Sequence, residues 1–412
     1  MARSIIVGEL RTGRRITTIP VRGASWSQVL RDGGDVGIDI PLGADEFARY
    51  ERTLSGLWPG PDLFLPFYPT PVTGVWRPGQ GMRPEFLAAL DPARCFLAAC
   101  EGSTVLEAGP IWAHRYNHRT NTLSVKAGGL GSLFDRRRVM GIVADGTAAA
   151  AWTETWSGVS LATMVKMLME QAESHTGGDL PIVFADDETT VADADHTRTW
   201  NGFDLGTTWD RVKQLMDVTN GPDVALEPRL TADRLGVVWD LRTGTEADPL
   251  LGQHSGDWVF DSRVPEGGVG DIDVTRDATG MASRSWVTGG GLAESTLMEF
   301  ADDTTMLDRG YPLMESVDAR GSVSERSTLA SWAAANLAGK LRPWMEWSLL
   351  IRADRFPWTA RPGDWAKVWI SDRHAYLRML VPAGFHRARI ARIEGGLGRF
   401  VRVVLIPEME IR

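Results

Sequence analysis

Alternating apolar and polar positions dominate the first 140 residues and predict short antiparallel strands. Two runs rich in β-branched residues, 5–10 and 16–21, lie on either side of a short glycine turn and predict a hairpin. A second pair of runs, 25–30 and 37–42, is separated by a turn rich in aspartate and glycine. The chain therefore opens with a small antiparallel β domain, and the pattern returns in three further predicted strands: residues 94–99, 104–111 and 122–127.

Helical spacing of apolar residues replaces the alternation in the middle of the chain. Residues 161–172 carry apolar side chains three and four positions apart behind Ser160, which is a candidate N-cap. A second helix is predicted over residues 209–218, behind two threonines. A third begins at the capping box of residues 322–325 and ends before Pro343, which cannot continue a helix.

Strand patterns return after Pro343. The charge also changes sign along the chain: residues 179–309 carry 26 acidic and 10 basic side chains, whereas residues 343–412 carry 7 acidic and 12 basic ones. Two β regions thus flank an acidic, more helical middle. The strands predicted in the second β region are residues 347–353, 365–370, 375–381, 388–393 and 399–406.

These patterns predict an α+β protein that is mainly β, with two small antiparallel β-barrel-like domains flanking an α+β middle. Prolines cannot donate ladder hydrogen bonds, so the proline-rich stretch within about residues 46–93 is interpreted as an insertion at the surface. The expected domains are a first β domain over 1–142, an α+β domain over 143–255, a small acidic β-rich domain over 256–322, and a helix with a second β domain over 323–412.

Composition narrows the classes of function. The chain has 412 residues and a formal net charge of −9, which disfavours a nucleic-acid binder that uses its whole surface. No apolar run approaches the roughly 18 residues of a membrane span. Two cysteines are too few for a disulfide framework, and Glu9 interrupts any signal-peptide core. Tryptophan is abundant, with 17 residues against 5 tyrosines, which fits core packing and also fits assembly interfaces.

No residue is assigned to catalysis, to a cofactor or to a metal. His114 and His118 lie in a strand and turn, where a spacing of four does not bring two rings together. The segment 158–162 around Ser160 faintly resembles a nucleophile elbow, but Ser160 fits the role of a helix cap better. The glycine clusters at 267–270 and 289–291 lack the residues of a phosphate loop. Solvated loops explain the remaining carboxylate pairs: Asp186 with Asp187, Asp193 with Asp195, Asp271 with Asp273, and Asp302 with Asp303.

Arginines recur along the last predicted strands and are candidates for one basic stripe. Such a stripe could face nucleic acid, an acidic partner or water, and the lack of interleaved aromatic residues favours water or a protein. Strict alternation places Arg392 on the same face as Ala388 and Ile390, opposite Arg387 and Arg389. The full set is Arg387, Arg389, Arg392, Arg399 and Arg402.

Several short segments of the sequence resemble the minor tail proteins of siphophages that infect actinobacteria. The resemblance is carried by residues 8–13, 19–21 and 24–30 near the N-terminus, and by residues 108–112, 127–130 and the arginine run 136–138. The turn Pro362-Gly363-Asp364, which leads into residues 365–370, is similar to the entry into the last β domain of phage hub proteins.

The resemblance implies a homotrimeric hub of the tail tip or baseplate, located in the virion and assembled in the host cytoplasm. Two tube domains from each of three chains would join the sixfold tail tube to threefold tip components. The implied partners are the distal tail protein or tail tube, the tape-measure protein, and other minor tail proteins or fibres. DNA would only pass through the lumen, which is expected to be neutral to acidic. The proline-rich stretch, residues 56–84, is expected outside the tube wall.

Two other classes of function remain open from the sequence. A cell-wall hydrolase associated with the tail is one, although a convergent catalytic motif is missing. A carbohydrate-binding receptor module is the other, because the tryptophan excess would supply stacking platforms.

Overall fold

A computed structural model describes residues 3–408 apart from residues 20, 43–83, 185–195, 219, 254, 264–267, 291–295, 320–325, 372 and 374. Most of the predicted proline-rich insertion, the capping box at 322–325, and the aspartates at 186, 187, 193 and 195 therefore lie outside the described residues. Among the described helices, none combines the length and the apolar character needed to cross a bilayer.

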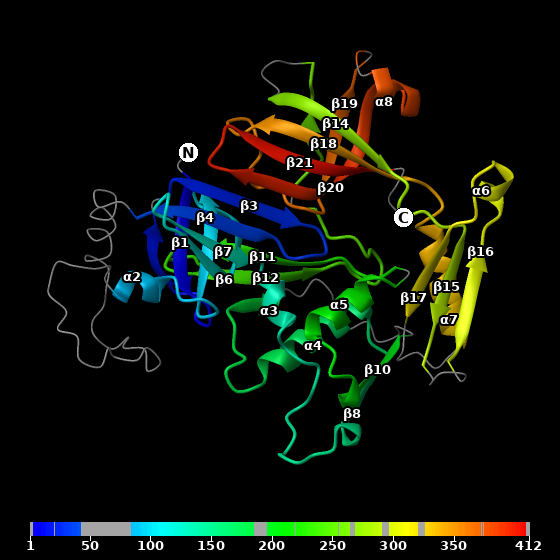
Figure 1. Ribbon diagram of the computed structural model, residues 1–412, viewed down its shortest axis with the longest axis horizontal. Helices are drawn as coiled ribbons and strands as arrows, with labels where there is room; N and C mark the ends of the chain where they lie inside the picture. Colours follow the sequence, from blue (N-terminus) through cyan, green and yellow to red (C-terminus); the bar gives the residue numbers. More distant parts are fainter. Residues whose placement is uncertain are drawn as a thin grey trace.

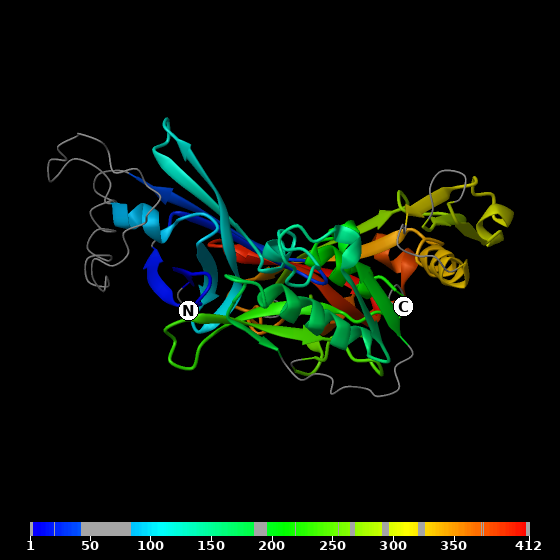
Figure 2. The ribbon, with the colours of Figure 1, turned by 90° about the horizontal axis from the view of Figure 1, so that it is seen from below.

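The N-terminal region is an antiparallel sheet, as the alternation predicts (Figure 1). Both predicted hairpins are confirmed, since β1 (Arg3–Glu9) pairs with β2 (Arg15–Ile19) and β3 (Gly23–Val29) pairs with β4 (Asp35–Pro41). Strand β5 (Cys95–Glu101), which follows the insertion, is buried along its whole length. The next strand, β6 (Thr104–Asn117), is longer, and it projects from the body together with its hairpin partner β7 (Thr122–Gly128) (Figure 2). The strands are β1 (Arg3–Glu9), β2 (Arg15–Ile19), β3 (Gly23–Val29), β4 (Asp35–Pro41), β5 (Cys95–Glu101), β6 (Thr104–Asn117) and β7 (Thr122–Gly128), and the short helix α2 (Pro84–Ala89) precedes β5.

The C-terminal region continues the same sheet. Strand β20 (Gly384–Gly396) pairs antiparallel with β3, with Arg392 opposite Val29 and Gly395 opposite Trp26. This seam joins the two β regions edge to edge, and the main path of strands runs from β14 at one end to β2 at the other, so the described strands form no closed barrel. The strands added are β13 (Trp258–Phe260), β14 (Val269–Asp277), β18 (Trp344–Arg352), β19 (Trp365–Ile370), β20 (Gly384–Gly396) and β21 (Phe400–Pro407).

The middle region places two helices beside the N-terminal sheet. The hydroxyl of Ser160 accepts a hydrogen bond from the Thr163 amide at 3.1 Å, and Thr207 accepts one from the Asp210 amide, so both predicted caps are confirmed. The helices begin where the sequence indicates and end within a few residues of the predicted ends. The elements are β8 (Thr153–Ser157), α4 (Leu161–Glu173), β9 (Ile182–Phe184), β10 (Thr197–Asn201), α5 (Thr208–Met216), β11 (Val224–Leu230) and β12 (Val237–Thr243), preceded by α3 (Gly131–Phe134).

A small unit stands to one side of the body, at the right of Figures 1 and 2. It consists of a three-stranded sheet with one helix packed on one of its faces, where Val287, Leu329 and Ala333 are buried together. The elements are β15 (Arg284–Thr288), β16 (Met298–Asp302), α6 (Thr305–Asp308), β17 (Glu315–Ala319) and α7 (Arg326–Ala338).

Two large hydrophobic cores lie on opposite faces of the N-terminal strands. One contains Val7 together with Trp347 and Ile390, so it is shared by both β regions. The other contains Phe96 together with Met164 and Trp239, so it joins the N-terminal sheet to the middle region. Alternate residues of β1 and β5 enter different cores, which explains why these strands are apolar almost throughout.

One predicted strand is wrong. Residues 375–381 contain the helix α8 (Ala375–Leu380) and no strand. The segment is made of alanine, leucine, arginine and methionine around a single tyrosine, and it has no β-branched residue before Val381. These residues favour a helix, so the apolar content was mistaken for a strand pattern.

The seam predicts a local sensitivity to side-chain size. A Cβ atom on Gly395 would lie 2.5 Å from Cζ2 of the buried Trp26, whereas one on Gly398 would meet nothing within 4 Å. We expect Gly395→Ala to lower the free energy of unfolding by about 1–3 kcal/mol through overpacking. The matched variant Gly398→Ala should change it by less than about 0.5 kcal/mol. Equal effects in urea unfolding would contradict this account of the seam.

Candidate functional site

The turn that enters β19 forms a rigid corner between the two β regions. Gly363 has a φ of +101°, which only glycine adopts without strain, and its amide donates to the Ile390 carbonyl at 2.7 Å. The buried Asp364 carboxylate accepts hydrogen bonds from the Arg361 amide and from Nε1 of Trp258, each at 3.0 Å. The predicted turn Pro362-Gly363-Asp364 is confirmed, and its aspartate closes the turn.

A buried ion pair connects this corner to the middle region. The Arg389 side chain on β20 is 4% exposed, and its Nε donates to the Gly363 carbonyl at 3.0 Å. Its Nη2 donates to the carboxylate of Asp223, which is also 4% exposed. The Leu251 amide supplies a further hydrogen bond to Asp223 at 3.3 Å. Both buried charges are therefore compensated, which buried ions require.

Arg31 brings the N-terminal region to the same carboxylate. It lies in the loop between β3 and β4 with a φ of 63°, and its Nε is 3.6 Å from Oδ1 of Asp223. Its Nη2 donates to the carbonyl of Met216, the last residue of α5. A cation at that end of a helix is favourable because unpaired carbonyls gather there. Arg31, Asp223 and Arg389 thus tie three regions of the chain together.

Next to this ion pair, Glu107 on β6 is buried beside Arg361. Burial raises the pKa of Glu107 to about 8, while a hydrogen bond from the Ala108 amide and the Arg361 charge act in the opposite direction. Burial also lowers the pKa of Arg361, whose Nη2 donates to the Val105 carbonyl at 3.0 Å. A Cβ atom on Gly34 would lie 2.2 Å from Oε2 of Glu107, so glycine is needed where the β3–β4 turn crosses this carboxyl group.

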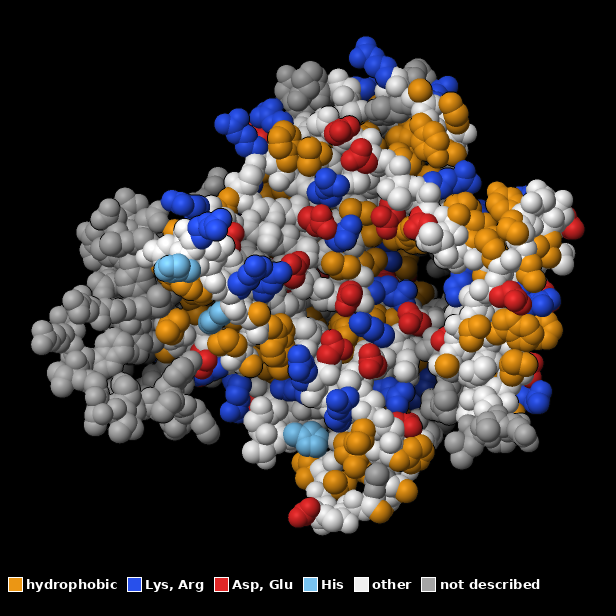
Figure 3. Space-filling model, viewed as in Figure 1, with side chains coloured by type: hydrophobic (Ala, Val, Ile, Leu, Met, Phe, Trp, Pro, Cys, Tyr) orange, Lys and Arg blue, Asp and Glu red, His pale blue; other side chains and the backbone are white. Residues whose placement is uncertain are grey.

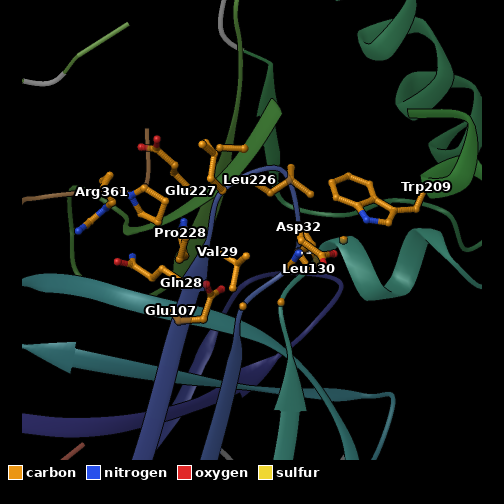
Figure 4. Close-up of a pocket in the computed structure, with 17 residues that line it drawn as sticks. Gln28, Val29, Asp32, Glu107, Leu130, Trp209, Leu226, Glu227, Pro228 and Arg361 are labelled. Carbon is orange, nitrogen blue, oxygen red and sulfur yellow. Dashed lines mark hydrogen bonds between the residues drawn. The ribbon is translucent and has the colours of Figure 1, made fainter. Parts of the chain in front are cut away.

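A small cavity of about 40 Å³ lies between these groups (Figure 4). Gln28 and Glu107 line one side of it, Arg361 and Glu227 another, and Trp209 of α5 approaches from the far end. A volume of this size holds a few water molecules and no organic substrate. The arrangement joins residues of the N-terminal, middle and C-terminal regions through polar groups. We call the residues that line this cavity, together with Arg31, Asp223 and Arg389, the three-way junction.

Two solved structures are similar to this chain over its whole length. The 43 kDa tail protein of prophage MuSo2 from Shewanella oneidensis has a TM-score of 0.52 at 8% identity, covering 99% of this chain and 100% of that one. The tail protein from Neisseria meningitidis MC58 has a TM-score of 0.52 at 12% identity, covering 99% and 97%. This chain has the fold of phage tail proteins. No protein-family model and no curated protein matches the sequence.

Within this tail-protein fold, the histidines and serine considered from the sequence take separate places. His114 lies on β6, and His118 lies in the following turn with its ring 6.4 Å from that of Tyr116. Across the described ranges, no group of three metal-binding side chains comes together. Ser160 is the cap of α4.

The described glycines of the two clusters include the buried Gly268 and Gly289, whereas the described carboxylates Asp271, Asp273 and Asp302 are exposed. Gly268 directly precedes β14, and Gly289 lies in the hairpin between β15 and β16. Asp271 and Asp273 are exposed on β14, and Asp302 pairs with Arg284 at 2.5 Å.

The predicted arginine stripe is altered by a β-bulge in β20. The register between β20 and β21 shifts between Ile390 and Arg392. The extra residue moves Arg392 to the face of Arg387 and Arg389, so the prediction from strict alternation is wrong. Ile393 instead joins Ala388 and Ile390 in the core.

The arginines of this face are neutralised by acids. Arg387 lies 3.1 Å from Asp257 and 3.2 Å from Glu408, and Arg389 pairs with Asp223. Arg392 lies 3.1 Å from Glu394. The acidic middle region supplies two of these partners, Asp257 and Asp223. Arg399 is exposed, and Arg402 lies 3.5 Å from the hydroxyl of Ser348.

Sequence reasoning missed the three-way junction apart from its turn. Arg389 and Asp223 are 166 positions apart, and neither stands in a motif. Glu107 interrupts the apolar residues of β6, and this was the one local signal of a buried carboxyl group.

The buried ion pair predicts a large loss of stability when one partner is removed. Arg389→Gln leaves Asp223 charged and buried, so we expect the free energy of unfolding to fall by about 3–5 kcal/mol. Arg392→Gln, which removes an exposed ion pair of the same strand, should cost less than about 1 kcal/mol. The double variant Arg389→Gln with Asp223→Asn should lose less than the sum of its single variants. If the losses in free energy of unfolding of the two single variants add up to the loss of the double variant in denaturant titrations, the two side chains do not interact directly.

The raised pKa of Glu107 predicts a pH dependence of stability. Between about pH 4.5 and 8 the folded protein keeps a proton on Glu107 that the unfolded chain releases, so stability falls as the pH rises through this window. The variant Glu107→Gln has no titratable group at this position, so it lacks this part of the pH dependence. We expect the stability of this variant relative to wild type to increase by up to about 1.4 kcal/mol per pH unit within the window. A difference that stays constant from pH 5 to pH 8 in urea unfolding would refute the assignment.

Proposed function

We propose that this protein is a structural, non-enzymatic hub of a phage tail tip or baseplate, and that it works as a homotrimer. The proposal combines the tail-protein fold with the sequence resemblance to minor tail proteins of siphophages that infect actinobacteria. Its expected place is the virion tail tip, after assembly in the host cytoplasm.

The seam between β3 and β20 is the observation that carries the proposal. It holds two β regions side by side as one sheet within one chain. Three chains then supply six β regions, which matches a sixfold tail tube on one side and threefold tip components on the other. A hub of this kind contacts the distal tail protein or tail tube, the tape-measure protein, and other minor tail proteins or fibres.

The charges of the surface support passage of DNA and not its retention. Acidic and basic side chains are interspersed over the face seen in Figure 3, with no single basic band. The pairs that Arg387 and Arg389 form with acids reduce the number of free cations on β20. A lumen that held many phosphates through arginines would stop a moving polyanion, so we place neutral or acidic groups in the lumen.

Mass measurement tests the assembly. We expect the purified chain to have three times the mass of the 45.2 kDa monomer, and to bind duplex DNA weakly at physiological salt. A monomer inside intact tails would overturn the homotrimer, and tight, salt-sensitive DNA binding would contradict the proposed lumen. Cell-wall zymography separates the hub from a hydrolase, because only a hydrolase leaves a cleared band.

A further inference from the structure

A cleft of about 270 Å³ separates the small unit from the middle region. One wall comes from β10 and the end of α5, and the other comes from one side of α7, at the right of Figure 1. Clefts between domains are common places for ligands, and this volume is close to the lower end of the roughly 300–1,000 Å³ of small-molecule sites. The side chains that matter for the argument are His196, Arg198, Val218, Ser327, Ser331 and Trp332.

Arg198 differs from the other partly buried arginines of the middle region. Arg211 and Arg242 each pair with a carboxylate, at 3.4 Å and 3.2 Å. The only hydrogen bond of the Arg198 guanidinium within the described part of the chain goes from Nη1 to the Thr197 carbonyl at 2.9 Å. Burial lowers the pKa of Arg198, and none of the described carboxylates offsets this effect. A guanidinium in this setting gains free energy when an anion enters the cleft.

The side chains around Arg198 offer hydrogen-bonding groups and apolar surface for an oxyanion that carries a polar ring. Ser327 and Ser331 are four positions apart on α7 and therefore share one side of the helix. The Ser331 hydroxyl donates to the Ser327 carbonyl at 3.0 Å, which fixes its oxygen as an acceptor. His196 is held by Glu246 at 2.8 Å. Val218 and Trp332 supply apolar surface to the same cleft.

We propose that this cleft binds a saccharide that carries a phosphate or carboxylate group. The Arg198 guanidinium would bind the anionic group through the N–H donors that no described residue accepts from, and the serine hydroxyls would bind hydroxyls of the sugar. The apolar carbons of a sugar ring fit against Trp332 and Val218. The volume admits one or two sugar rings and excludes a folded segment or a nucleic-acid duplex. The proposal stands independently of the trimer.

Binding of small probes by the full chain tests the site. The probes are glucose 1-phosphate, glucuronate, inorganic phosphate and glucose, measured by calorimetry and ligand-observed NMR. We expect both charged sugars to bind with millimolar or tighter affinity, and glucose to bind at least tenfold more weakly. Arg198→Gln should weaken the charged sugars at least tenfold, and Ser327→Ala by two- to threefold. Arg234→Gln, which removes an exposed arginine elsewhere, should leave binding unchanged.

The outcomes separate the competing explanations. Equal binding by wild type and Arg198→Gln overturns the site, and so does the absence of binding by either charged sugar. If inorganic phosphate binds as tightly as glucose 1-phosphate, the sugar ring adds nothing to the affinity. The proposal of a saccharide ligand is then wrong, and the cleft is a site for an anion only. If Arg198→Gln fails to fold in a thermal melt, Arg198→Lys replaces it. The lysine keeps the charge but loses the planar fork, so it should bind the charged sugars three- to tenfold more weakly.

Discussion

The buried pair of Arg389 and Asp223 can form only when distant parts of the chain are already in place. Arg389 comes from the C-terminal sheet and Asp223 from the segment that precedes β11, and Arg31 approaches the same carboxylate from the loop after β3. A buried ion without its partner is costly, so incorrect positions of these regions relative to each other are disfavoured.

The continuous sheet extends this constraint to the whole body. Main-chain hydrogen bonds between β3 and β20 fix the register of the two β regions, and Trp26 packs against Gly395 directly on the seam. The shared core, with Trp347 and Ile390 beside Val7, then buries one face of both regions. A protein that must keep two units at a constant spacing benefits from such a joint, because hydrogen bonds, packing and a buried charge must all break before the units separate.

The small unit follows a different principle. Among the described residues its sheet is buried against α7 on one face, and a cleft separates it from the middle region. Within that described part, no carboxylate pairs with Arg198 in the cleft. The continuous sheet and the shared core join the two β regions, whereas a cleft lies between the small unit and the middle region. This division suits a protein with a fixed scaffold and a peripheral recognition surface.

Local sequence determined the elements that depend on neighbouring residues. The two N-terminal hairpins, the caps at Ser160 and Thr207, and the turn at Gly363 were predictable because the residues that stabilise each of them are adjacent in the chain. Segment 375–381 was mistaken for a strand because short apolar runs carry no clear period.

Tertiary structure alone decided the rest. The seam, the ion pair and the burial of Glu107 depend on groups far apart in the sequence, and the bulge in β20 depends on its register with β21. Pairing across such distances is chosen by the whole packed chain, since no single segment contains both partners of any of these interactions.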